Sequence, residues 1–283
     1  MGDGDNEPIT GMAAGVPFTA LPPTVNIDGP ARLVLAWHML DAPCTDAAFA
    51  AALPLTGVPA WRVYLGMPLC GARMIEDSMD AVVELARKDP LMAYLAPFVW
   101  QAAEEFPAAL SALRQQLPVD NGPLGVLGGS LGGMVVLQIL TQSQIPIAAA
   151  ALVNPAVRVR SALGLVGGAT GRPYPWNAES RKAADRLDFV AHVEDIAART
   201  PQPPLLVLSG ELDFPVLRAD AAELVGALRE RYAQPDHIAL TTVPDLAHPL
   251  AEPPGLQPAP QLPTAKAVGE AITQWFLHHL TTH

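Results

Sequence analysis

The fold is decided by the stretch Leu124-Gly125-Val126-Leu127-Gly128-Gly129-Ser130-Leu131-Gly132-Gly133-Met134-Val135-Val136-Leu137. Its first four residues predict a short buried strand, and residues 131–141 predict a buried helix. The turn between them fits the pattern G-x-S-x-G, which stands on a tight strand-to-helix connection. Small neighbours let the strand and the helix approach closely. A glycine-rich loop of no chemical importance is the alternative, but the flanking strand and helix favour a nucleophilic serine.

Two later residues stand where they can activate Ser130, since a serine hydroxyl alone is a weak nucleophile. Asp213 comes after a predicted strand over 205–210, and His248 comes after another over 237–243. The carboxyl edge of an open α/β sheet is where sites form. We therefore predict that His248 is the base and Asp213 its partner. Glu211 is the alternative acid, but its longer side chain begins nearer the strand.

The order serine, aspartate, histidine along the chain is the order found in the α/β-hydrolase family. The chain resembles that family over roughly residues 16–280. The resemblance implies an α/β domain over residues 16–283, with a mostly parallel sheet of roughly eight strands and helices on both faces. Residues 156–200 are expected to form a small cap or insertion. Residues 1–15 are expected to form a flexible N-terminal tail.

The remaining pattern alternates apolar strands with amphipathic helices, as a parallel sheet requires. Buried strands are predicted at 32–38, 61–65 and 147–153, and helices at 46–53, 76–88, 98–117, 178–198, 217–232 and 264–280. Residues 16–21 and 24–27 are expected to be edge strands, because proline is excluded from central strands. Glycines and prolines between 164 and 175 predict a loop-rich segment.

An acyl-transfer site needs two backbone N–H groups that hold the developing oxyanion. One is expected from Leu131, the residue after the serine. The resemblance implies that the second comes from the loop after strand 32–37, where family members often have His-Gly. Here His38 matches the histidine, whose usual role is structural, and Met39 takes the place of the glycine. The Met39 side chain is expected to narrow the acyl pocket.

Weaker similarity links residues 67–73 and 129–133 to small esterases related to the prolyl-oligopeptidase group. Apolar and aromatic side chains around the predicted site are candidates for substrate binding, with ordinary core packing as the alternative. These candidates are Trp37, His38, Met67, Trp176 and Phe214.

Composition restricts the classes of function. The chain has 283 residues, of which 50% are hydrophobic, and a formal net charge of −11. An acidic chain without a basic run is a poor candidate for binding nucleic acid or an anionic membrane. Neither a signal peptide nor an apolar run of membrane-spanning length is evident, so a cytoplasmic location is expected. Histidines, carboxylates and the two cysteines lack metal-ligand spacing, and no metal or cofactor is expected.

These observations predict a serine hydrolase that cleaves a small or medium carboxylic ester through an acyl-enzyme on Ser130. Thioesterases, acyltransferases, carbon–carbon bond hydrolases and short peptidases use the same fold and triad, and they remain alternatives. A ligand-binding protein on a hydrolase fold is the non-enzymatic alternative. It would have no need of all three residues Ser130, Asp213 and His248.

Overall fold

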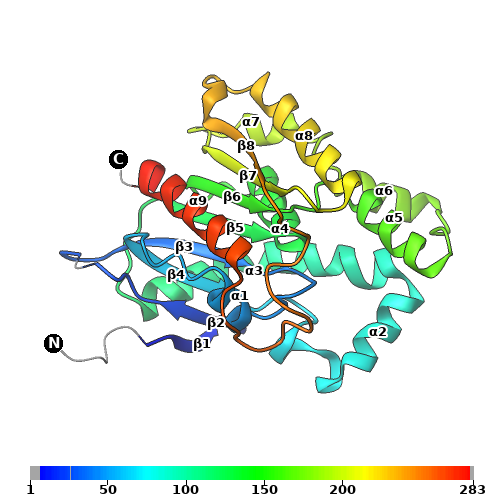
Figure 1. Cartoon of the computed structure of the whole chain (residues 1–283), viewed down its shortest axis with the longest axis horizontal. Helices are drawn as coiled ribbons and strands as arrows, with labels where there is room; N and C mark the ends of the chain where they lie inside the picture. Colours follow the sequence, from blue (N-terminus) through cyan, green and yellow to red (C-terminus); the bar gives the residue numbers. More distant parts are fainter. Residues whose placement is uncertain (1–6, 26, 281–283) are drawn as a thin grey trace.

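A sheet of eight strands runs through the computed structural model, which describes residues 7–25 and 27–280. The strands are β1 Ile9–Ala13, β2 Val16–Leu21, β3 Arg32–Trp37, β4 Ala60–Leu65, β5 Leu124–Gly129, β6 Ile147–Val153, β7 Leu205–Gly210 and β8 Ile238–Val243. They lie in the order β1-β2-β4-β3-β5-β6-β7-β8 (Figure 1). β2 pairs antiparallel with β1 and β4, and all other pairs are parallel. The predicted fold class is confirmed.

Helices cover both faces of this sheet, so its central strands are apolar on both sides. The helices are α1 Asp46–Ala52, α2 Met79–Lys88, α3 Ala96–Gln116, α4 Leu131–Gln142, α5 Val159–Thr170, α6 Ala178–Arg186, α7 Val193–Ala197, α8 Pro215–Arg229 and α9 Pro263–Leu280. Along β3, Leu33 and Leu35 pack in a core with α3 and α4, whereas Val34 and Ala36 pack with α1 and α9. Figure 1 shows α9 lying across the near face of the sheet.

The N-terminal segment corrects two expectations. Residues 9–13, placed in a flexible tail by the sequence, form β1 and pair with β2 from Ile9↔Ala20 to Ala13↔Val16. β2 in turn pairs with β4, so residues 16–21 form an inner strand instead of an edge strand. Pro17 is tolerated because it stands near the start of β2, where its carbonyl accepts a hydrogen bond from the Gly66 N–H at 2.8 Å. Residues 24 and 25 lie outside the strands, and residue 26 lies outside the described residues.

The segment between β6 and β7 carries α5, α6 and α7, where the sequence predicted a loop followed by a single helical region. Gly164, Gly167 and Gly168 lie inside α5. Glycine disfavours helix by only about 1 kcal/mol, and burial of apolar residues such as Leu163 against the main core outweighs that cost. Figure 1 shows α5, α6 and α2 projecting at the same end of the sheet.

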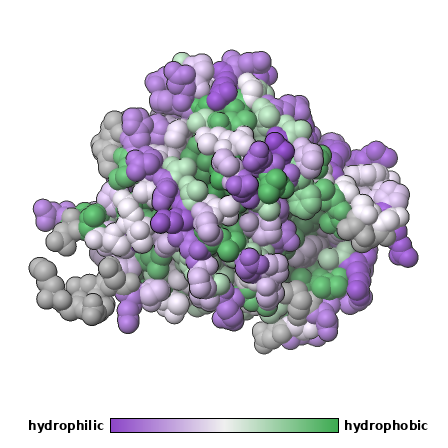
Figure 2. Space-filling model, viewed as in Figure 1, coloured by the Kyte–Doolittle hydropathy of each residue, from purple (hydrophilic) through white to green (hydrophobic). Residues whose placement is uncertain are grey.

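The surface of the molecule carries both hydrophilic and hydrophobic side chains. Figure 2 shows hydrophilic side chains over most of the visible face, with smaller hydrophobic patches between them. Within the described part of the chain, no helix combines the length and the apolar character needed to cross a membrane.

Candidate active site

Ser130 stands on the connection between β5 and α4 in a backbone conformation with φ 47° and ψ −113°. Non-glycine residues rarely adopt a positive φ, and here hydrogen bonds on both sides hold it. The Ser130 N–H donates to the Val153 carbonyl at 2.9 Å, and its own carbonyl accepts from the Ala156 N–H at 3.0 Å. These bonds fix the serine to the end of β6 and present its side chain at the carboxyl edge of the sheet.

Glycines at 128 and 132 make this connection possible. A Cβ on Gly128 would lie 2.5 Å from the Gly132 carbonyl carbon, and one on Gly132 would lie 2.5 Å from the His38 carbonyl oxygen. Both distances are to backbone atoms, which cannot move aside as a side chain can. The pattern G-x-S-x-G therefore reflects close packing of the turn against itself and against the loop after β3.

Three side chains form a hydrogen-bonded chain at this edge. The Ser130 hydroxyl donates to His248 Nε2 at 2.8 Å, and His248 Nδ1–H donates to Asp213 Oδ1 at 2.7 Å. All three residues are buried, with exposed fractions of 7%, 6% and 4% respectively. Asp213 Oδ1 also accepts from the Phe214 N–H at 2.7 Å. The structure thus brings together the serine, base and acid that the sequence predicts, and Glu211 instead accepts from the Asp245 N–H at 3.3 Å.

A fourth residue, Asn154, ties together two loops. One follows β7 and carries Asp213 (the acid loop), and the other follows β8 and carries His248 (the histidine loop). Its Oδ1 accepts from the Gly210 N–H at 2.7 Å, and its Nδ2 donates to the carbonyls of Ala247 at 2.8 Å and His248 at 3.1 Å. Asn154 is fully buried and has φ 44°, a conformation that asparagine tolerates better than most residues. Sequence reasoning missed this role. The only sequence signal is a polar residue directly after an apolar strand.

His38 shapes the loop that carries the predicted second oxyanion donor. Its Nδ1–H donates to the Met39 carbonyl at 2.6 Å, and its Nε2 accepts from the Met67 N–H at 3.2 Å. Burial lowers the pKa of His38 to about 4, so the ring is neutral near pH 7. A neutral ring with one donor and one acceptor satisfies both backbone groups. His38 is therefore a structural brace between two loops.

The two predicted oxyanion donors lie at this edge of the sheet. Leu131 is the first residue of α4, whose first N–H groups have no carbonyl partner inside the helix. The Met39 N–H donates to no atom of the described residues. The Met39 side chain is fully buried, and its Cγ would lie 2.8 Å from a Cβ on Gly129. It fills the core beneath the turn, which corrects the expectation that it narrows the acyl pocket.

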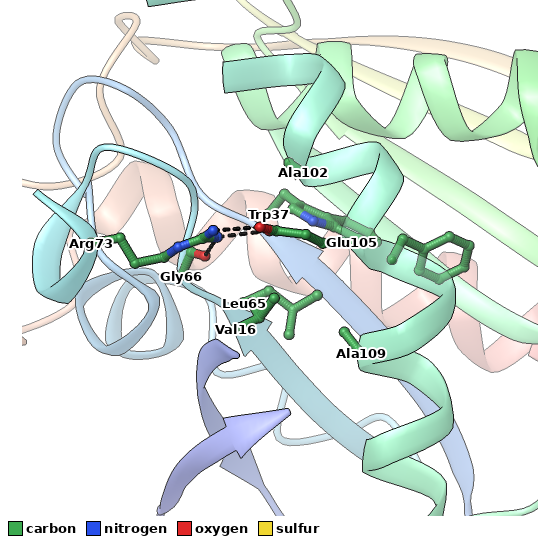
Figure 3. A pocket seen from close by; sticks show the side chains of 9 residues that line it. Val16, Trp37, Leu65, Gly66, Arg73, Ala102, Glu105 and Ala109 are labelled. Atoms are coloured by element: carbon green, nitrogen blue, oxygen red, sulfur yellow. Dashed lines mark hydrogen bonds and ion pairs between the residues drawn. The ribbon is translucent and has the colours of Figure 1, made fainter. Parts of the chain in front are cut away.

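Burial divides the five substrate-binding candidates into two groups. Trp37, His38 and Met67 are at most 2% exposed. Trp37 packs edge-on against Phe106 and lines a small pocket together with the ion-paired Arg73 and Glu105 (Figure 3). These three residues are core residues, because apolar packing and backbone hydrogen bonds take up their surfaces.

The other two candidates lie nearer the surface. Trp176 lies within the helical insertion and packs edge to face against Tyr174, with 4.8 Å between the ring centroids. The guanidinium carbon of Arg160 lies 5.4 Å from the centroid of the Trp176 ring. Phe214 is 43% exposed, and its ring centroid lies 5.3 Å from that of His248. Phe214 therefore contacts the hydrogen-bonded chain through the ring of His248.

Two hollows of the described surface contain none of Ser130, Asp213 and His248. One is the small pocket of Figure 3, and the other lies between α3 and the end of α4. No group of three or more histidine, cysteine, aspartate or glutamate side chains in residues 7–25 and 27–280 is arranged to hold a metal ion.

The sequence profile described as the Prolyl oligopeptidase family matches residues 101–280, which is more than half of the chain. The chain belongs to the prolyl oligopeptidase family. The match contains Ser130, Asp213 and His248, and β1 to β4 lie outside it. Membership makes the chain an α/β-hydrolase and a serine hydrolase. Among curated proteins, no sequence matches this chain significantly.

Solved structures show the same fold at low sequence identity. TT1662 from Thermus thermophilus is 18% identical with a TM-score of 0.61, and the alignment covers 96% of this chain and 98% of that one. A puromycin-hydrolyzing peptidase from Mycobacterium tuberculosis is 17% identical with a TM-score of 0.67, covering 98% of this chain and 40% of that one. Carboxyl esterase 2 from Tuber melanosporum is 16% identical with a TM-score of 0.60, covering 99% and 88%. The alignment thus covers most of the esterase but under half of the peptidase.

Proposed function

We propose that this serine hydrolase cleaves a small or medium carboxylic ester through an acyl-enzyme on Ser130. The observation that carries the proposal is the continuous hydrogen-bonded chain from Ser130 through His248 to Asp213. Such a chain gives the hydroxyl a base and fixes the tautomer of that base. A carboxyl esterase and a peptidase both share this fold, so the choice of an ester over a peptide substrate is part of the proposal.

In the first half of the reaction, Ser130 Oγ attacks the ester carbonyl carbon while His248 Nε2 takes the hydroxyl proton. The N–H groups of Leu131 and Met39 hold the oxyanion. The carbon–oxygen bond to the leaving group then breaks, and His248 Nε2 gives its proton to the departing alcohol. Asp213 stabilises the imidazolium through the bond to Nδ1.

In the second half, a water molecule loses a proton to His248 and attacks the acyl carbon. The bond to Ser130 Oγ breaks, the carboxylic acid leaves, and the serine regains its proton. An ester is a less demanding substrate for this machinery than an amide, because the amide nitrogen must be protonated before it can leave. Every proton in the cycle passes through His248 Nε2, which lies 2.8 Å from Oγ.

The test is hydrolysis of p-nitrophenyl esters from acetate to octanoate by the wild type and the Ser130→Ala variant. Turnover should fall by about 10⁴-fold in the variant, while its circular dichroism spectrum stays native. Ser161→Ala, on α5, is the matched control and should keep wild-type turnover. Turnover retained by Ser130→Ala would refute the proposal.

Inactivity toward every ester is a second informative result. If a serine-reactive phosphonate still labels Ser130, the triad works on another acyl bond, and the ester assignment is wrong. Thioesters, amides and carbon–carbon bonds then replace esters as the substrates to test. Added alcohols separate hydrolysis from acyl transfer, because an acyltransferase would yield a new ester instead of free acid.

A further inference from the structure

Asp41 is a carboxylate beside the nitrogen that carries the catalytic proton. It lies two residues after Met39 in the loop that follows β3, and its Oδ2 is 3.7 Å from His248 Nε2. The Asp41 side chain is 63% exposed, whereas that of Asp213, on the other side of the imidazole, is 1% exposed. Within the described residues, Asp41 forms no ion pair with lysine or arginine. Its charge is open to solvent and to whatever binds at Nε2.

Backbone contacts hold the Asp41 loop against the histidine loop. The Leu250 N–H donates to the Ala42 carbonyl at 2.9 Å, and the Cys44 N–H donates to the Gly255 carbonyl at 2.9 Å. Gly255 has φ 66°, and a Cβ there would lie 2.5 Å from the Ala42 Cα. The two loops therefore pack backbone to backbone. The position of Asp41 relative to His248 follows from this packing, although its side chain is exposed.

An aromatic ring contacts the same imidazole. Phe214 follows the acid Asp213, its ring centroid lies 5.3 Å from that of His248, and the residue is 43% exposed. An exposed aromatic ring and a carboxylate that has no lysine or arginine partner among the described residues are two groups that bind ammonium ions, the first through its quadrupole and the second through its charge. Both stand at His248.

The reaction fixes which part of a substrate meets these groups. The oxyanion lies at Leu131 and Met39, and the leaving group must reach His248 Nε2 to receive its proton. The leaving group therefore lies beside Asp41. We propose that Asp41, assisted by Phe214, selects substrates whose leaving group carries a positive charge, such as esters of amino alcohols. This inference rests on the proposed function, and it names the substrate class of that same site.

The test uses two esters with the same acyl group, a choline ester and its neutral isostere, the 3,3-dimethylbutyl ester. The ratio of their kcat/KM values is the readout, because a general loss of turnover cancels within one protein. The wild type should prefer the choline ester by roughly fivefold at low salt, since the charges meet near solvent, and sodium chloride should reduce the preference.

Three variants at Asp41 and Phe214, with one control, assign the preference. Asp41→Asn should bring the ratio near one, and Asp41→Lys should favour the neutral ester. Phe214→Leu should lower the ratio by a smaller factor. Glu84→Gln removes the same charge from an exposed side chain on α2 and should leave the ratio unchanged. A wild-type ratio near one, or a preference that survives Asp41→Asn, would overturn the inference.

A second measurement separates this inference from the proposed function. Ser130 is treated with two phosphonothiolates that differ only in a cationic or a neutral thiol leaving group, and the labelling rates are compared. Labelling that favours the cationic reagent in the wild type but not in Asp41→Asn supports the inference even without ester turnover. Labelling of Ser130 at equal rates overturns the inference and leaves the serine mechanism standing. No labelling and no hydrolysis of either ester overturns the proposed function, and the inference with it.

Discussion

The turn that carries Ser130 and the two loops that carry Asp213 and His248 meet at one edge of the sheet, but they are held differently. The turn depends on missing side chains, since Gly132 faces the carbonyls of Trp37 and His38 with no room for a Cβ. The two loops depend on a side chain that is present, because Asn154 binds backbone groups of both. One region should thus be most sensitive to an added atom and the other to a lost polar group.

The largest effect is expected from Gly132→Ala. The new Cβ would overlap backbone carbonyls, so α4 must move away from the loop after β3. We expect the free energy of unfolding to fall by more than about 3 kcal/mol and turnover to fall by about 10³-fold as Ser130 shifts. Chemical denaturation and ester hydrolysis measure both quantities.

Gly164→Ala, in α5, is the matched control for this substitution, because a Cβ there meets nothing within 4 Å. It should stabilise the protein by about 0.5–1 kcal/mol through helix propensity. If Gly132→Ala matched Gly164→Ala in stability, the close approach at the turn would be wrong.

A smaller effect is expected from Asn154→Ala. The substitution leaves the Gly210 N–H and two carbonyls without their partner, which should cost about 2 to 3 kcal/mol of unfolding free energy. Because Asp213 and His248 lose their common support, kcat should fall by about 10²-fold with little change in KM. Kinetics are measured well below the unfolding temperature.

Asn154→Asp sharpens the comparison, since it keeps the acceptor for Gly210 and loses the donors to Ala247 and His248. Its kcat should fall between those of the wild type and Asn154→Ala. A loss of stability in both variants with wild-type kcat would show that Asn154 supports the fold without positioning the histidine.

The smallest effect concerns His38, which joins two loops by a side chain as Asn154 does. Its pKa is lowered from 6.5 to about 4 by burial, so the unfolded chain binds a proton at pH 5 and the folded one does not. Stability therefore falls as the pH drops from 6.5 toward 4, by about 1 to 2 kcal/mol between pH 7 and pH 5.

His38→Gln removes this titration and should flatten the dependence of the unfolding free energy on pH across that window. The variant itself is expected to be less stable at pH 7, because glutamine matches the two backbone partners less well. An unchanged slope between pH 7 and pH 5 would mean that the pKa of His38 is the same in the folded and the unfolded chain.

Much of this site was predictable from sequence because it depends on local patterns. The apolar run, the glycines and the serine lie within one stretch, and each predicted residue follows its own strand. Parallel pairing of β5 to β8 then brings Ser130, Asp213 and His248 to one edge. The predicted substrate-binding role of Trp37 and Met67 was wrong because it depended on which layer buries each side chain. Burial of a large apolar side chain against one layer or another leaves no distinct mark in the sequence.

The sequence by itself determined the alternation of strands and helices, the glycine-rich turn that carries Ser130, and the order of Ser130, Asp213 and His248 along the chain. Hydrophobic periodicity and glycine spacing record burial and backbone conformation residue by residue. Tertiary structure alone decided that residues 9–13 join the sheet, that Asn154 bridges two loops and that Asp41 faces His248. Asn154 reaches a carbonyl 94 residues away, and such a contact depends on strand order and loop packing, which no local pattern encodes.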